Sequence, residues 1–262
     1  MPIGGRIEGG GGGGGSSPPW AVEYEVDFST ESSHDFTSTA TVTIGSVDWT
    51  AENTAGAPDT FELDGSTGLR IFATSQNRYW WDGTSSCPFV SAKIDDMMSD
   101  FSRSDTVCLQ VHMDSSSDVS ANYHSYGLGL WDGTLNDGTG FVLSRRIWDG
   151  SAKTGFIRDS TQDLTVDGTQ RDFFEIVWLP CDGQILSAGS FSGSFPEPLS
   201  TEAYRSYTST DRASYGTGPS ATPTWKIPHD DGRFAVFCQS QNAGSTLEVT
   251  VYKMRVLRRV NS

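Results

Sequence analysis

Hydrophobic and polar residues alternate with a period of two along much of the chain after Trp20. In residues 22–28, for example, the apolar Val, Tyr, Val and Phe are separated by Glu, Glu and Asp. This period predicts β-strands with one buried and one solvated face. Residues 173–179 are apolar at nearly every position, which predicts a central strand that is buried on both faces. Further strands are predicted at residues 69–73, 106–113 and 234–238.

The apolar positions of the last predicted strand change phase. Those at 247, 249 and 251 share one face of a regular strand, whereas those at 254 and 256 fall on the other. Because a shift of one residue turns every later side chain over, we predict a β-bulge near Tyr252 or Lys253.

Turn signals separate the predicted strands. Asp-Gly pairs, which favour tight hairpins, begin at positions 64, 82, 132, 137, 149, 167, 182 and 231. Helical spacing is confined to a short stretch around residues 94–101, which we interpret as one or two turns or a connection. Many strands with almost no helix predict an all-β fold, a two-sheet antiparallel β-sandwich or jelly roll, over residues 20–262.

Residues 1–19 differ from the rest in composition. Gly9 to Gly15 is an unbroken glycine run, followed by two serines and two prolines. Glycine loses the most backbone entropy on ordering, so this segment is predicted to be a flexible arm. One interpretation is a disordered tail or linker. The other is an assembly arm that orders against a partner through residues such as Ile3, Arg6 and Ile7.

Charge and composition exclude several classes of partner. The formal net charge is −15, which repels nucleic acid, so no nucleic-acid partner is expected. No stretch approaches the roughly 20 apolar residues that span a bilayer, and the N-terminus has no secretory signal pattern. We therefore expect synthesis in the cytoplasm without membrane insertion. The four cysteines include no Cys-x-x-Cys pair, so zinc spacing is absent and free thiols are favoured.

The order and character of the predicted elements resemble the concanavalin A-like lectin and glucanase (LamG-type) sandwich. The stretches that carry this resemblance are residues 88–94, 106–111, 126–130, the hairpin around 181–183, 233–238 and 246–257. It covers roughly residues 20–259 and implies a domain that binds or hydrolyses glycans.

Hydrolysis is not expected. Laminarinase-type members of that family carry Glu-x-Asp-x-x-Glu on one strand, and this sequence has no such motif. Glycoside hydrolysis needs two carboxyls about 5 to 9.5 Å apart, but the candidate strand has only Glu175, between Phe173 and Val177 on one face. We therefore predict no catalytic residues. One interpretation has His112 and His124 facing each other across neighbouring strands; the other, which we favour, treats them as ordinary strand histidines.

Aromatic residues are the better candidates for glycan binding, because Trp-Asp-Gly occurs three times. An exposed indole stacks on a sugar ring while the neighbouring carboxylate accepts hydrogen bonds from its hydroxyls. The candidate residues are Tyr79, Trp80, Trp81, Asp82, Trp131, Asp132, Trp148 and Asp149. The alternative is that each Trp ends a strand and packs inward while Asp-Gly makes the turn.

Calcium is the one cofactor that the sequence leaves open. Asp95, Asp96 and Asp100 form an acidic cluster, but calcium needs six to eight oxygen ligands, and the cluster does not match an EF-hand loop. A solvated loop is the alternative. No other cofactor is expected.

A virion structural protein combines the sandwich without hydrolase residues, the glycine-rich arm and the missing export signal. We predict a non-enzymatic bacteriophage capsid decoration, head-fibre or tail component, anchored to other virion proteins through residues 1–19. It is expected to form a homo-oligomer and to display a sandwich that binds host surface glycans. The alternatives are a free lectin-like module and a divergent glycoside hydrolase.

Overall fold

The computed structural model describes most of the sandwich. The described residues are 20–36, 39–52, 60–74, 89–98, 105–115, 124–131, 140–148, 151–158, 161–166, 172–179, 184–191, 193–195, 212–215, 232–240 and 246–259. The predicted arm, with Ile3, Arg6, Ile7, Gly9 and Gly15, lies outside them.

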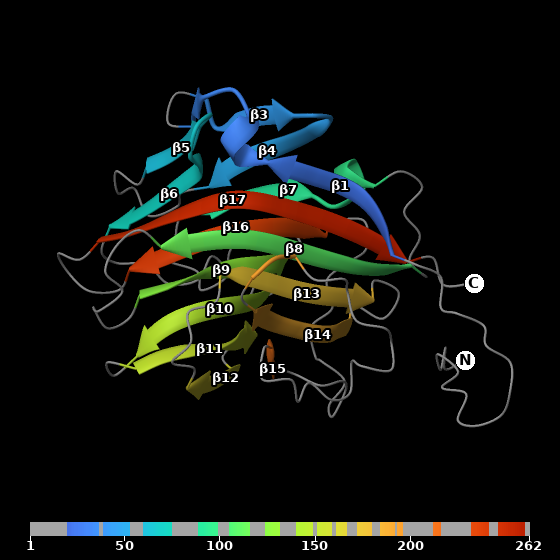
Figure 1. Ribbon diagram of the computed structural model, residues 1–262, viewed down its shortest axis with the longest axis vertical. Helices are drawn as coiled ribbons and strands as arrows, with labels where there is room; N and C mark the ends of the chain where they lie inside the picture. Colours follow the sequence, from blue (N-terminus) through green and yellow to red (C-terminus); the bar gives the residue numbers. More distant parts are fainter. Residues whose placement is uncertain are drawn as a thin grey trace, which may run out of the picture.

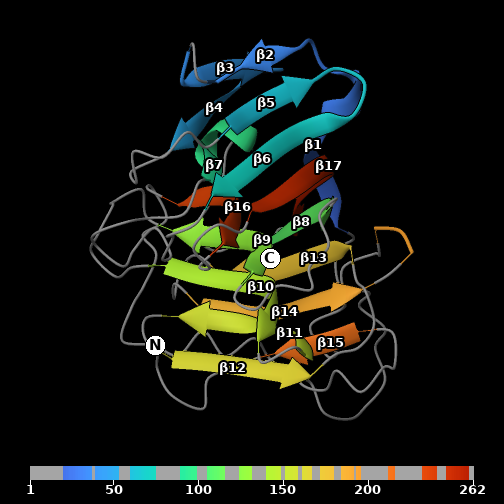
Figure 2. The ribbon, with the colours of Figure 1, turned by 90° about the vertical axis from the view of Figure 1, so that its left-hand side faces the viewer.

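Two antiparallel sheets form the described part of the chain, and they pack face to face as a β-sandwich (Figures 1 and 2). Sheet A runs in the order β15 (Arg212–Tyr215), β14 (Gln184–Phe191), β13 (Phe173–Leu179), β8 (Thr106–Ser115), β17 (Thr246–Arg259), β6 (Gly68–Thr74), β5 (Thr60–Asp64) and β2 (His34–Asp35). The ninth strand, β1 (Ala21–Asp27), pairs with β17. The predicted fold class is therefore confirmed.

Sheet B has eight strands among the described residues. Their order is β12 (Thr161–Val166), β11 (Ser151–Arg158), β10 (Gly140–Trp148), β9 (His124–Trp131), β16 (Arg233–Ser240), β7 (Phe89–Lys93), β4 (Val47–Glu52) and β3 (Thr41–Ile44). The described helices are two 3-10 turns, η1 (Phe28–Thr30) and η2 (Asp95–Met97). Within this described part, no helix is long and apolar enough to cross a membrane.

The strand β17 organises sheet A because it is the longest strand of the described chain. Its 14 residues pair with β8 along one edge and with β6 and then β1 along the other (Figure 1). Strands that lie far apart in the sequence, from residue 21 to residue 259, therefore meet on one element.

The core lies between the sheets and is continuous. Trp49 on β4 is fully buried and makes edge-on contacts with the rings of Phe28 and Phe234, at centroid distances of 5.5 and 6.2 Å. Its Nε1 donates a hydrogen bond to the hydroxyl of Tyr24 on β1 (3.2 Å), which donates in turn to the carbonyl oxygen of Ile44. The buried indole therefore has a polar partner, as a group removed from water requires.

Gly68 begins β6 in a conformation that other residues avoid, with φ of +127°. A Cβ atom built there would lie 2.6 Å from the carbonyl oxygen of Val251. Glycine is therefore required both by its backbone angle and by the close approach of β17.

We expect Gly68→Ala to lower the free energy of unfolding by about 3 kcal/mol or more, because strain and a backbone clash act together. Gly193→Ala is the matched control, since Gly193 also has a positive φ (+110°) but has nothing within 4 Å of its ideal Cβ; about 1 kcal/mol is expected there. Urea unfolding of both variants measures the difference. Equal costs would show that the approach of Val251 does not matter.

Candidate functional site

The outward face of sheet A carries the most distinctive set of side chains in the described chain. Apolar residues at alternate positions of β8, β13 and β17 point into the core, so the remaining positions point outward. Pairing then aligns outward residues in rows across the strands. One row joins Phe173, His112, Lys253 and Asp27, and the next joins Glu175, Gln110, Arg255 and Glu25.

A β-bulge at Tyr252 adds a further aromatic ring to this face. The pairing of β17 with β8 passes from Val251 opposite Met113 to Lys253 opposite His112, so Tyr252 is the inserted residue. The bulge predicted from the phase change is therefore confirmed. Its effect is to return Met254 to the core face, so the apolar residues before and after it are buried together.

His112, Phe173, Tyr252 and Phe195 form a cluster that we call the aromatic patch. The rings of His112 and Phe173 stack in parallel, with centroids 4.2 Å apart and planes 6° apart. Tyr252 lies against the other side of His112 at 4.8 Å, and Phe195 meets Phe173 edge-on at 5.3 Å. His112, Tyr252 and Phe195 are partly exposed, whereas Phe173 is 7% exposed.

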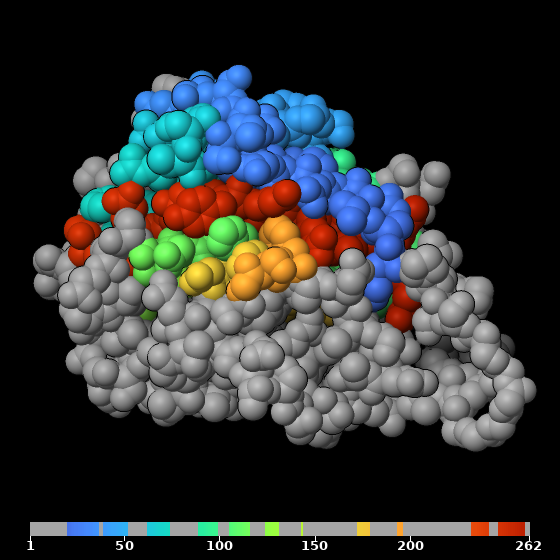
Figure 3. All heavy atoms as spheres, in the orientation of Figure 1, coloured from blue at the N-terminus to red at the C-terminus, as the bar shows by residue number. Residues whose placement is uncertain are grey.

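Figure 3 shows the segments that carry these rings from outside the molecule. Atoms of β8 (green), β13 (yellow) and residues 193–195 (orange) lie next to β17 (red) on the visible face. The aromatic patch therefore combines side chains from four segments that are distant in the sequence.

The aromatic patch is uncharged at neutral pH. Burial lowers the pKa of His112 from its ordinary value of 6.5, although Asp172, Asp114 and Asp27 pull it upward. Burial also raises the pKa of Tyr252, and Asp114 and Asp172 raise it further. The imidazole and the phenol are therefore both neutral, with carboxylates around them.

The row beside the aromatic patch is a buried polar chain. The Nε2 atom of Gln110 donates to Oε2 of Glu175 at 2.6 Å, and Nε of Arg255 donates to Oε1 of Gln110 at 2.6 Å. Gln110 is fully buried and Glu175 is 2% exposed. The guanidinium of Arg255 also lies 4.8 Å from the ring centre of Phe195. Gln110 therefore couples a carboxylate to a guanidinium and holds Arg255 against the patch.

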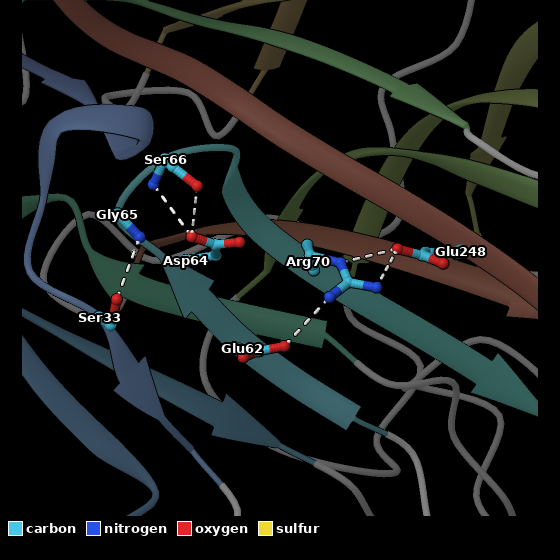
Figure 4. A network of polar contacts seen from close by, with 7 residues as sticks. All are labelled: Ser33, Glu62, Asp64, Gly65, Ser66, Arg70 and Glu248. Carbon is cyan, nitrogen blue, oxygen red and sulfur yellow. Dashed lines mark hydrogen bonds and ion pairs between the residues drawn. The ribbon is translucent and has the colours of Figure 1, made fainter.

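An ion-pair network joins β17, β6 and β5 (Figure 4). Arg70 on β6 contacts Glu248 at 2.6 Å and Glu62 at 3.1 Å, and the Nε atom of Arg70 also donates to Glu248. In the turn after β5, the Asp64 carboxylate accepts hydrogen bonds from the amide and hydroxyl of Ser66. Partly exposed pairs of this kind add little stability, but they fix the positions of the carboxylates.

The structure separates two of the three Trp-Asp-Gly sequences. Trp131 ends β9 and pairs with Gly140 at the start of β10, whereas Trp148 ends β10. At roughly 3.3 Å per residue, their backbones lie about 26 Å apart at opposite ends of β10. Both tryptophans end strands, as the alternative interpretation expects, but whether they pack inward or face outward stays a prediction because their side chains are outside the described part. Tyr79, Trp80, Trp81, Asp82, Asp132 and Asp149 also lie outside the described residues.

The remaining candidate residues have separate outcomes. Asp95 and Asp96 are exposed on η2, and Asp100 lies outside the described residues. The described residues contain no group of three or more His, Cys, Asp or Glu arranged to hold a metal.

Glu175 lies between Phe173 and Val177 on one face, as predicted. The interpretation in which His112 and His124 face each other is wrong, because β8 and β9 belong to different sheets.

Sequence reasoning missed the aromatic patch, although two signals pointed to it. The outward positions of β13 include Phe173 and Val177, which are apolar without facing the core. The predicted bulge placed both Tyr252 and Lys253 outward. His112 was noticed, but assigned to the wrong partner.

The detectable similarity of this chain to known proteins is limited to solved structures with low TM-scores. No protein-family model matches the sequence, and no curated protein is detectably similar to it. Similar solved structures include the CBM2 module of the evolved Dit protein of Lactobacillus casei BL23 phage J-1 (10% identity, 94% of this chain and 100% of that chain, TM-score 0.48). A second is an endo-1,3-β-glucanase from Streptomyces sioyaensis (8% identity, 94% of this chain and 99% of that chain, TM-score 0.48). A third is the family-7 alginate lyase A1-II' (12% identity, 85% of this chain and 85% of that chain, TM-score 0.41). All three TM-scores are below 0.5 and all three identities are at most 12%, so these similarities assign neither a family nor a function to this chain.

The lowered pKa of His112 predicts a pH-dependent stability. Because the folded state binds this proton less readily than the unfolded state, the free energy of unfolding is expected to fall as the pH drops below the ordinary value of 6.5. The His112→Phe variant keeps an aromatic ring but cannot titrate at this position. Between about pH 7.5 and 5 its free energy of unfolding should therefore fall less than that of the unmodified protein. Burial also lowers the pKa of His124, so the part of the pH dependence that comes from His124 remains in the variant. Chemical denaturation across this range provides the measurement, and superimposable profiles would contradict the assignment.

Proposed function

We propose that this chain is a non-enzymatic, carbohydrate-binding β-sandwich that binds glycan on the outward face of sheet A. The observation that carries the proposal is the aromatic patch, in which two partly exposed rings, His112 and Phe195, pack on Phe173 and a third, Tyr252, packs on His112. Aromatic faces supply apolar contact area, and nearby polar groups fix the orientation of a bound ligand. Sugar rings match both features, since C–H groups pack on the rings and hydroxyls bond to the surrounding carboxylates.

The patch is organised before any ligand arrives. His112 and Phe173 are paired residues of neighbouring strands, and Tyr252 is fixed by the bulge. Arg255, held by Gln110, supports Phe195. Side chains that are ordered in advance lose little entropy on binding, which favours affinity.

The polar row supports the non-enzymatic part of the proposal. Glu175 is buried and accepts a hydrogen bond from Gln110, and the other carboxylate of the row, Glu25, is held by Lys253 at 2.8 Å. Their backbones are three strand spacings apart, about 14 Å. Glycoside hydrolysis requires carboxyls about 5 to 9.5 Å apart, so this pair does not suit it.

We further propose that the sandwich is displayed on a virion and anchored through residues 1–19. The arm joins the sandwich at Trp20, which packs against Cys108, Val177 and Leu257 on the outward face of sheet A. The guanidinium of Arg259 lies 5.2 Å from the ring centre of Trp20. This packing gives the glycine-rich segment a fixed point of attachment, as a tether requires.

A polysaccharide-cleaving enzyme is the second candidate, favoured by the contact between His112 and Tyr252. A neutral imidazole can act as general base and a phenol as general acid. In β-elimination of a uronate, the base removes the proton beside the carboxylate and the acid protonates the leaving oxygen as the carbon–carbon double bond forms. Arg255 is the cation of the neighbouring row, and in this candidate mechanism it would pair with the uronate carboxylate.

Binding to a panel of immobilised laminarin, mannan, galactan, xylan, alginate and polygalacturonate tests the proposal. We expect Tyr252→Ala and Phe195→Ala each to weaken binding about tenfold, the equivalent of about 1.4 kcal/mol, because each removes a partly exposed ring. Val22→Ala is the control, since Val22 is 51% exposed outside the patch. Full binding by both patch variants would reject this site.

The same panel separates binding from cleavage. New reducing ends, or the ultraviolet absorbance of unsaturated sugars, would favour the enzymatic candidate if they disappeared in Tyr252→Phe. Binding without either product supports the non-enzymatic proposal.

The anchoring role is tested by removing residues 1–19. We expect the full chain to form oligomers or to bind purified particles, and the truncated chain to remain monomeric with its glycan binding intact, because Trp20 stays in place. Size-exclusion chromatography with light scattering measures the mass of both forms. Identical monomers that both fail to bind particles would reject the anchoring role.

A further inference from the structure

Arg259, the last residue of β17, carries a buried guanidinium. The residue is 4% exposed, and its Nη1 atom is buried without a hydrogen-bond partner. Within the described chain its guanidinium lies 5.2 Å from the ring centre of Trp20 and forms no ion pair. A buried charge is costly unless it is paired and hydrogen-bonded, so this cation lacks the partner that its burial calls for.

The neighbouring arginine is paired on the other side of the sheet. Arg258 contacts Glu23 at 2.9 Å and Asp105 at 3.7 Å. Successive residues of a strand point to opposite faces. Because Val256 belongs to the core, Arg258 points to the core side and Arg259 points outward. The two carboxylates that serve Arg258 therefore lie across the sheet from Arg259.

The surroundings of Arg259 on the outward face are apolar. Trp20 packs against the neighbouring row, which consists of Leu257, Cys108 and Val177, each at most 2% exposed. The nearest charged row of the described residues on this face is that of Arg255, four residues along β17 and about 13 Å away. Surroundings of low polarity strengthen the attraction between a guanidinium and an anion.

Trp20 is the wall of this site that can move to admit a ligand. It is partly buried, and the pairing of β1 with β17 begins at the next residue, Ala21 opposite Arg258 (Figure 1). Displacement of the indole therefore breaks none of the described strand pairings. A cation–π contact also supplies no lone-pair acceptor to the five N–H donors of a guanidinium, so these donors can serve a ligand.

We propose that Arg259 and Trp20 form a binding site for a single carboxylate group. The guanidinium fork matches a carboxylate through two parallel hydrogen bonds, and one negative charge balances the one positive charge. The indole and Leu257 pack against the apolar part that carries the carboxylate. The site lies six residues along β17 from Lys253 of the His112 row, about 20 Å away, so it is separate from the proposed glycan site.

Two sources can supply this carboxylate. One is a small free carboxylate such as formate or acetate. The other is Glu8, the only acidic residue among residues 1–19. The 12 residues from Glu8 to Trp20 reach at most about 40 Å, and this attachment gives Glu8 a high effective concentration at the site.

The test begins with the full chain carrying Glu8→Gln, whose arm has no carboxylate. Urea unfolding is measured in acetate and in chloride at equal ionic strength. A ligand that binds only the folded state raises the folding equilibrium constant about elevenfold at ten times its dissociation constant. We expect acetate to produce such a rise in Glu8→Gln and none when Arg259→Met is added. Because salts also act on any protein surface, the difference between these two chains is the quantity that decides.

The unmodified chain identifies the source. If its response to acetate equals that of Glu8→Gln, the site takes a free carboxylate. If the unmodified chain unfolds at higher urea and responds less to acetate, Glu8 occupies the site. Both results support a carboxylate site at Arg259.

Two further variants act as controls. Arg70→Gln should keep the full response to acetate, because Arg70 already contacts Glu248 and Glu62. Arg259→Lys keeps the charge without the fork, so its response should be weaker. Glycan binding should stay unchanged in Arg259→Met, which separates this site from the proposed function.

Nuclear magnetic resonance of the Arg Nε–H groups keeps the test decisive if Arg259→Met does not fold. In Glu8→Gln, acetate should shift one of these signals more than the others, and that signal should be missing in Arg259→Lys. An equal response to acetate with and without Arg259→Met, or the absence of any Arg Nε–H signal that moves with acetate, would overturn the site.

Discussion

The pairing of β17 with β8 is the constraint on which the rest of the molecule depends. β17 joins the first and last parts of the chain in one sheet, and its register on β8 decides which residues share a row. The bulge at Tyr252 divides the strand into two halves that bury their apolar residues on the same side. Without it, one half would turn Met254 outward and Lys253 inward. The inserted residue thus keeps the core continuous and supplies an outward ring to the aromatic patch.

The buried row of Glu175, Gln110 and Arg255 explains why this face remains polar beside its aromatic residues. A carboxylate that is 2% exposed is costly unless hydrogen bonds compensate for its lost water. Gln110 provides one such bond and passes its own carbonyl to Arg255. The guanidinium then contacts Phe195, so compensation of a buried charge and placement of a ring result from one arrangement.

Much of the fold could be predicted from the sequence because alternation and turn chemistry are local properties. The strands, the hairpin turn at Asp64 and the bulge near Tyr252 all followed from neighbours within a few residues. The site did not, because His112, Phe173 and Phe195 meet only through the pairing of distant strands. The same limit explains the misplaced His112–His124 pair: adjacent order in the sequence does not reveal that β8 and β9 belong to opposite sheets.

The position of Trp20 bears on both proposed roles of the domain, anchoring and glycan binding. Trp20 packs on the outward side of sheet A, against the row that follows Glu175, Gln110 and Arg255. Trp20, the residue that follows the predicted arm, therefore lies on the same face of the sandwich as the aromatic patch. Nineteen residues can extend to about 60 Å, whereas the five strands from β13 to β5 occupy about 19 Å between their outer axes. A tether of that length can hold the domain to a surface without pressing the patch against it, so the proposed anchoring and the proposed glycan binding are compatible on one face.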